Sequence, residues 1–180
     1  SIGRCCTANL TLTIRQKAGV TIPKAAPVSV FCWLENSAGE KSGELELGHF
    51  FISRRSGSGS LLAMTCRDSM VKAGQTYQDK TAYTEWPVAM TDVVAEICSI
   101  MGVELDSRTV IQTGDDYKIS FPNEDTLITE ILSGIAAAHG GNFVITETGK
   151  LRLVPMFKID KNSENEFKVD KSYYTFTPYS

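Results

Sequence analysis

The sequence predicts an α+β fold, in which a small, partial antiparallel β-barrel is followed by an α+β domain with two helices and a β-hairpin. Short stretches with the alternating pattern of strands occupy the first 67 of the 180 residues. Two later stretches repeat their apolar residues with the period of a helix. The charge of the chain also changes sign between these two parts.

That change of charge lies near residue 72. Residues 1–72 carry nine Lys and Arg against five Asp and Glu, whereas residues 73–155 carry five against twelve. A shift of this kind is typical of a domain boundary. We therefore predict a β-barrel domain over residues 1–72, an α+β domain over 73–155 and a return segment towards the barrel over 156–180.

The composition is that of a globular protein, with 42% hydrophobic and 22% charged residues. No apolar run approaches the ~20 residues that a membrane span needs, so no membrane contact is expected. A net charge of −3 lacks the basic character of nucleic-acid-binding proteins, so no specific nucleic-acid binding is expected. The first residues show no signal-peptide pattern.

Four strands are expected in the first domain. In residues 4–15, apolar side chains alternate with Thr, Asn and Arg, which is typical of a half-buried strand. Further strands are predicted at 28–34, 45–52 and 61–67, each bounded by turn residues. Gly48 interrupts the third strand and indicates a bulge or bend there.

Two amphipathic helices and a hairpin are expected in the second domain. The first helix has Thr91 as its candidate N-cap and ends at Gly102, a suitable C-cap. The second has Asn123 as its candidate N-cap and ends at Gly140. Residues 142–155 alternate in two short runs around a turn, which predicts the hairpin.

Residues that commonly bind metals or form disulfides are few and scattered. The five cysteines are odd in number and include no CxxC pair, so we expect reduced thiols used as small core residues. His49 and His139 are interpreted as a strand residue and a helix-end residue, because no HExxH or HxH motif is present. The cysteines are Cys5, Cys6, Cys32, Cys66 and Cys98.

Catalytic motifs are equally lacking, because the sequence contains no GxGxxG, P-loop or GxSxG motif. Cys98 lies on the apolar side of the first predicted helix and is interpreted as a packed thiol rather than a nucleophile. The acidic pairs at 115–116 and 124–125 are interpreted as solvated charges, although either could belong to a glycosidase pair. We predict no catalytic residue, no cofactor and no metal, and therefore no enzyme.

The order of several short motifs along the chain is more informative than any one of them. These motifs are Gly48–Ser53 (GHFFIS), Thr65–Lys72 (TCRDSMVK), Ala89–Leu105 (AMTDVVAEICSIMGVEL), Gly140–Phe143 (GGNF) and Thr148–Leu153 (TGKLRL). Together they resemble the baseplate hub, tail-tip and tail-associated proteins of phages and prophages of Gram-positive bacteria. The resemblance covers most of residues 2–155.

This resemblance implies a structural protein of the virion tail, made in the cytoplasm of the bacterial host. Related hubs are trimers whose paired β-barrels form a ring that joins the tail tube to the spike or fibre. The implied partners are therefore further copies of the chain and other tail proteins, namely the tail tube, distal tail or spike protein.

Contacts in such a ring need exposed aromatic or charged side chains. We predict Arg54, Arg55, Tyr173, Tyr174 and Phe176 as interface residues, whereas Trp33 is interpreted as a core residue.

Two other classes of function stay open at this point. One is a tail-associated cell-wall hydrolase or peptidase fragment, and the other is a carbohydrate- or protein-binding module.

Overall fold

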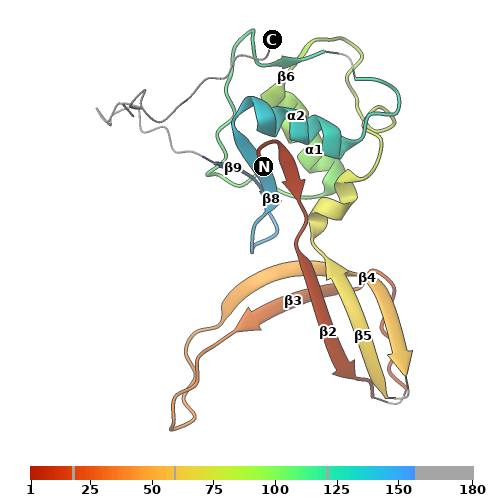
Figure 1. Cartoon of the computed structure of the whole chain (residues 1–180), viewed down its shortest axis with the longest axis vertical. Helices are drawn as coiled ribbons and strands as arrows, with labels where there is room; N and C mark the ends of the chain where they lie inside the picture. The colour runs from red at the N-terminus through yellow and green to blue at the C-terminus, as the bar shows by residue number, and fades with distance from the viewer. Residues whose placement is uncertain (18, 59, 121, 157–180) are drawn as a thin grey trace, which may run out of the picture.

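The computed structural model describes residues 1–17, 19–58, 60–120 and 122–156, which form two lobes along the long axis of the molecule (Figure 1). One lobe is a curled four-stranded sheet, and the other combines two α-helices with smaller sheets. The predicted fold class, α+β with a partial antiparallel barrel, is confirmed. The domain boundaries at residues 72 and 155 stay predictions.

The lower lobe in Figure 1 is an antiparallel sheet that curls into half a barrel. In spatial order, its strands are β2 (Asn9–Arg15), β5 (Leu61–Arg67), β4 (Leu45–Ser58) and β3 (Pro27–Cys32). Within the described part of the chain, the edge strands β2 and β3 do not pair with each other, so the barrel is open. Only Ile52, Met64 and Cys66 of its apolar cluster are buried.

Two bulges bend β4, which is longer than the strand predicted at 45–52 and continues to Ser58. The register against β3 shifts beside Gly48, as predicted, and the register against β5 shifts beside Ser53. Gly48 has a φ of 155°, and a Cβ there would lie 2.8 Å from the Phe50 ring. Glycine therefore permits both the backbone angle and the close approach.

Among the described residues, the upper lobe contains eight helices and strands. They are β1 (Arg4–Cys6), the 3-10 helix η1 (Ser69–Ala73), β6 (Val88–Ala89), α1 (Met90–Met101), β7 (Lys118–Ile119), α2 (Ile128–Ala138), β8 (Gly141–Ile145) and β9 (Leu151–Pro155). A three-stranded sheet has the order β1-β8-β9, with β1 parallel to β8. The predicted hairpin is β8 and β9. Helix α2 packs on β1 and β8, and α1 contacts α2 and η1.

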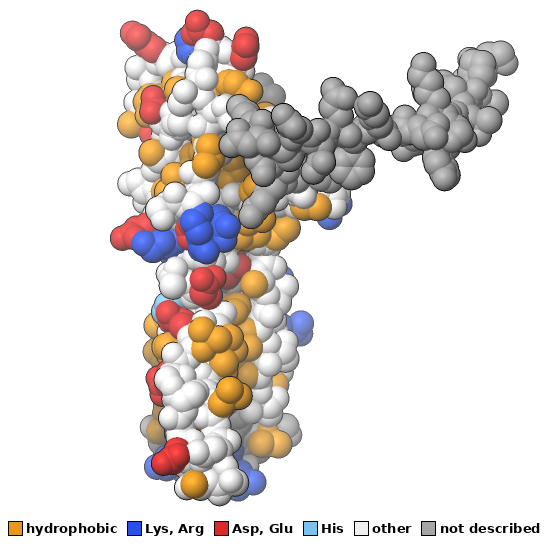
Figure 2. All heavy atoms as spheres, turned by 90° about the vertical axis from the view of Figure 1, so that its left-hand side faces the viewer, with side chains coloured by type: hydrophobic (Ala, Val, Ile, Leu, Met, Phe, Trp, Pro, Cys, Tyr) orange, Lys and Arg blue, Asp and Glu red, His pale blue; other side chains and the backbone are white. Residues whose placement is uncertain are grey.

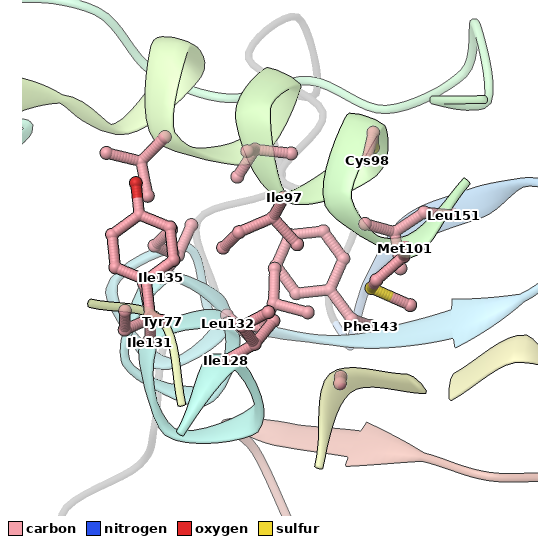
Figure 3. Packing of buried hydrophobic residues seen from close by; sticks show 14 of the residues in the cluster. Tyr77, Ile97, Cys98, Met101, Ile128, Ile131, Leu132, Ile135, Phe143 and Leu151 are labelled. Carbon is pink, nitrogen blue, oxygen red and sulfur yellow. The ribbon is translucent and has the colours of Figure 1, made fainter. Parts of the chain in front are cut away.

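The main hydrophobic core lies in this upper lobe, between the two helices and the sheet (Figure 3). Ile97 and Met101 of α1, Leu132 of α2, and Phe143 and Leu151 of the hairpin are at most 1% exposed. The helical residues among them occupy the periodic apolar positions of the sequence. Side chains three or four residues apart share one helix face, and this face is the one that is buried. No helix in the described ranges is long and apolar enough to cross a membrane.

The strand predicted over residues 4–15 is broken. It divides into β1, which ends at Cys6, and β2, which begins at Asn9, and the two belong to different sheets. The buried Asp68 carboxylate holds the break, because it accepts the Ala8 N–H at 2.7 Å and the Met70 N–H at 3.0 Å. The alternation of the sequence hides this break, because the two residues between the strands keep its parity.

Helix α1 begins earlier than predicted and helix α2 begins later. The N-caps are Ala89 and Leu127 rather than Thr91 and Asn123. The predicted end of α1 is confirmed, because Gly102 has the left-handed backbone conformation of a C-cap, with φ 62° and ψ 46°.

Candidate functional site

The structure places the predicted interface residues Arg54 and Arg55 on β4, directly after its second bulge. They line an open pocket of about 500 Å³, which we name the basic pocket. The guanidinium of Arg55 donates to the backbone carbonyl of Ile22, which ties the preceding loop to the strand. The pocket is lined by Lys24, Ala25, Ile52, Ser53, Arg54 and Arg55.

The hairpin between β3 and β4 projects from the half-barrel as an arm, defined here as residues 31–47 (Figure 1). Hairpin pairing continues beyond the strands, where the Ser42 N–H donates to the Leu34 carbonyl at 2.8 Å. At the turn, the side-chain oxygen of Asn36 accepts two backbone N–H groups, at 2.9 and 3.0 Å. The arm is therefore an ordered hairpin with a fixed turn.

Large apolar side chains of the arm face solvent. Leu34 is 79% exposed and Leu45 is 61% exposed. The interpretation of Trp33 as a core residue is wrong, because its side chain is exposed and the Lys41 ammonium lies 4.4 Å from its ring centroid. Figure 2 shows hydrophobic side chains gathered on this side of the lower lobe, with acidic side chains beside them. The exposed apolar residues of the arm are Phe31, Trp33, Leu34, Leu45 and Leu47.

Three residues that no sequence motif connects also meet on the half-barrel. The hydroxyl of Ser29 lies 2.9 Å from Nδ1 of His49, and Nε2 of His49 lies 2.8 Å from the Glu46 carboxylate. The sequence serine, histidine, carboxylate is that of a hydrolase triad, but the two ring nitrogens are exchanged, because a triad histidine faces its serine with Nε2 and its carboxylate with Nδ1. A hydrolase also needs oxyanion donors in a site that excludes water, whereas this imidazole is 43% exposed on the sheet. We interpret the trio as a tie between β3 and β4.

In the upper lobe, a polar network joins the segment after η1 to helix α1. The hydroxyl of the fully buried Tyr77 donates to the Glu96 carboxylate. That carboxylate also accepts the Thr81 hydroxyl at 2.8 Å and the Ala82 N–H at 2.7 Å. Burial and the nearby carboxylate raise the pKa of Tyr77 well above its usual range. The phenol is therefore a permanent donor, and the network has a structural role.

The cysteines divide between the core and the surface. Cys66 and Cys98 are buried, as predicted, and burial raises the pKa of the Cys98 thiol to about 11. A thiol with this pKa is unreactive near neutral pH. The prediction of core positions is wrong for Cys6 and Cys32, which are exposed. His139 lies at the end of α2, as predicted.

Two further observations concern the other candidate residues. In the part of the chain that the structure describes, no three His, Cys, Asp or Glu side chains lie close enough together to hold a metal ion. The predicted interface residues Tyr173, Tyr174 and Phe176, with nearly all of the predicted return segment, lie outside the described residues.

Comparison with known proteins gives a result at the level of the fold. No protein-family profile matches the sequence, and no curated protein matches it. A half-barrel joined to this α+β lobe is a fold found in a phage tail protein. One similar structure is that of the prophage MuSo2 43 kDa tail protein from Shewanella oneidensis, with a TM-score of 0.56 and 15% sequence identity. The match covers 84% of this chain and 47% of that protein, so this chain spans about half of its length.

Proposed function

We propose that this chain is a structural component of a phage or prophage tail. Its place is the baseplate hub or tail-tip ring that joins the tail tube to the spike or fibre. The observation that carries the proposal is the fold shared with a prophage tail protein over 84% of the chain. The ordered sequence motifs support the hub position and a phage of Gram-positive bacteria. On this proposal, the protein is made in the host cytoplasm and becomes part of the virion tail.

The proposed partners are further copies of this chain, as a homotrimer, and the neighbouring tail tube, distal tail or spike proteins. Two features favour contacts of this kind. The edge strands β2 and β3 leave backbone N–H and C=O groups available for pairing, because they do not pair with each other among the described residues. The arm also exposes five large apolar side chains, which is typical of an interaction site.

Deleting the coding sequence from a host that carries the prophage tests the proposal. Particles released after induction are examined by electron microscopy, with a plasmid copy of the wild-type gene as the control. The proposal predicts heads without complete tails in the deletion strain and restored tails with the plasmid. Normal tails in the deletion strain would contradict it.

We also propose that this segment performs no catalysis. The trio of Ser29, His49 and Glu46 is the observation that favours the alternative of a cell-wall hydrolase fragment. Hydrolysis of a nitrophenyl ester and release of fragments from purified peptidoglycan measure that activity. The proposal predicts equal background rates for the wild-type chain and the Ser29→Ala variant. A wild-type rate at least tenfold above that of the variant would favour the hydrolase.

A further inference from the structure

Charge is segregated within the half-barrel lobe more sharply than its small net charge suggests. All four acidic residues of positions 1–67 lie between positions 35 and 46, in the arm. Seven of the eight basic residues of positions 1–67 lie outside the arm, and three of these line the basic pocket. One molecule therefore carries an acidic projection and a basic cavity.

Several of these charges have no ion-pair partner among the described residues. The ion pairs of the described residues leave Glu35 and Glu44 of the arm without a basic partner, and Lys24 and Arg54 of the pocket without an acidic one. The arm ends at Leu47, within β4, and the pocket residue Arg54 lies seven positions further along this strand. At about 3.3 Å per residue, that separation is roughly 23 Å along the strand. An ordered hairpin that projects from the sheet does not reach back over this distance.

We propose that the arm of one copy seats at the basic pocket of the next copy, so that the chains associate head to tail. This inference rests on the proposed role as a ring-forming tail protein and names the surfaces that form the ring. A contact between two different surfaces of identical subunits generates a closed ring when its rotation closes. A second copy fits the observations because both complementary surfaces belong to one lobe.

Apolar burial and charge have different parts in this contact. Leu34 and Leu45 are 79% and 61% exposed in the single chain, and their burial supplies the driving force. The carboxylates of Glu35 and Glu44 meet the cations of the pocket and set the orientation of the two copies. Because the Asn36 turn already orders the arm, little conformational entropy is lost when it docks.

Light scattering after size-exclusion chromatography of the whole chain tests the contact by charge reversal. The arm variant is Glu35→Lys with Glu44→Lys, and the pocket variant is Lys24→Glu with Arg54→Glu. A third chain combines all four changes. The matched control is Glu124→Lys with Asp125→Lys, two exposed acidic residues of the other lobe.

We expect a mass of about 59 kDa for the wild type and the control, which is three times the 19.7 kDa of one chain. Each reversed variant is expected at the mass of one chain, and the combined chain is expected to recover the wild-type mass. Circular dichroism confirms that each variant is folded. If a reversal unfolds the chain, Leu34→Ala removes arm contact without changing charge, and the same loss of mass is expected.

Three results would overturn the inference. They are a wild type that stays a monomer at every concentration, reversed variants that keep the wild-type mass, and a folded combined chain that does not recover it. None of these results changes the outcome of the deletion experiment, so the proposed tail function is judged separately.

Discussion

Replacing Leu132 by Ala tests whether the helices and sheet of the upper lobe form the stabilising core. Leu132 is 0% exposed and lies in the core shown in Figure 3, between α1 and the β8–β9 hairpin. The substitution removes three carbons from a site that is enclosed by neighbouring elements. Leu-to-Ala changes at such sites lower the free energy of unfolding by 2–5 kcal/mol, and we expect about 3 kcal/mol here.

Thermal unfolding followed by circular dichroism measures this loss. For a chain of this length, about 3 kcal/mol corresponds to a fall in melting temperature of about 9 °C. Val110→Ala is the control, because it removes apolar carbons from a side chain outside the arm that is 68% exposed. We expect that control to unfold within 2 °C of the wild type. A Leu132→Ala variant that also unfolds within 2 °C would refute the assignment of the core.

Three further predictions concern single contacts. Tyr77→Phe removes one of three donors to a carboxylate and is expected to lower the free energy of unfolding in urea by about 1.5–2 kcal/mol. The guanidinium of Arg108 holds the pKa of Asp106 well below its usual range, mainly through their side-chain hydrogen bond. Asp106→Asn is therefore expected to be less stable than the wild type at pH 7, and the difference is expected to narrow as the pH falls below about 4. Gly102→Ala places a side chain at a φ of 62° and is expected to lower the free energy of unfolding by about 1 kcal/mol. Gly134→Ala adds a methyl group in open space within α2 and is expected to raise the free energy of unfolding by about 0.5–1 kcal/mol.

Each of these predictions has a result that would contradict it. An unchanged urea midpoint for Tyr77→Phe would mean that its hydrogen bond contributes no net stability. A stability difference for Asp106→Asn that stays constant between pH 7 and pH 2 would exclude the ion pair as its cause. Glycine variants that change stability in the same direction would contradict the assigned backbone conformations.

The upper lobe could be predicted well because its signals are local. The apolar period of α1 and the glycine at its end specify a helix within a dozen residues, and the β8–β9 hairpin has the same kind of signal. The helix starts were predicted less well, since Thr91 and Asn123 are good N-cap residues that do not cap either helix. The tertiary packing of the chain, and not the local capping preference of these two residues, determines where each helix begins.

The half-barrel shows where sequence patterns stop being sufficient. The break between β1 and β2 depends on the parallel pairing of β1 with β8, more than 130 residues away in the chain. The basic pocket could be anticipated only in part. Arg54 and Arg55 are adjacent in the sequence, whereas Lys24 lines the same pocket only because the chain folds. The sequence does not reveal the exposure of Trp33, because an aromatic residue within a strand pattern looks the same in a projecting arm as in a core.

Immunogold labelling of purified particles tests the proposed tail position most directly. Antibodies against this chain are applied to particles from a host that carries the gene. Particles from the deletion strain serve as the control for background labelling. The proposal predicts gold at one place on each particle, the end of the tail that lies away from the head. Gold along the whole tail tube, on the head, or on no particle at all would contradict the proposed place of this protein in the hub or tail tip.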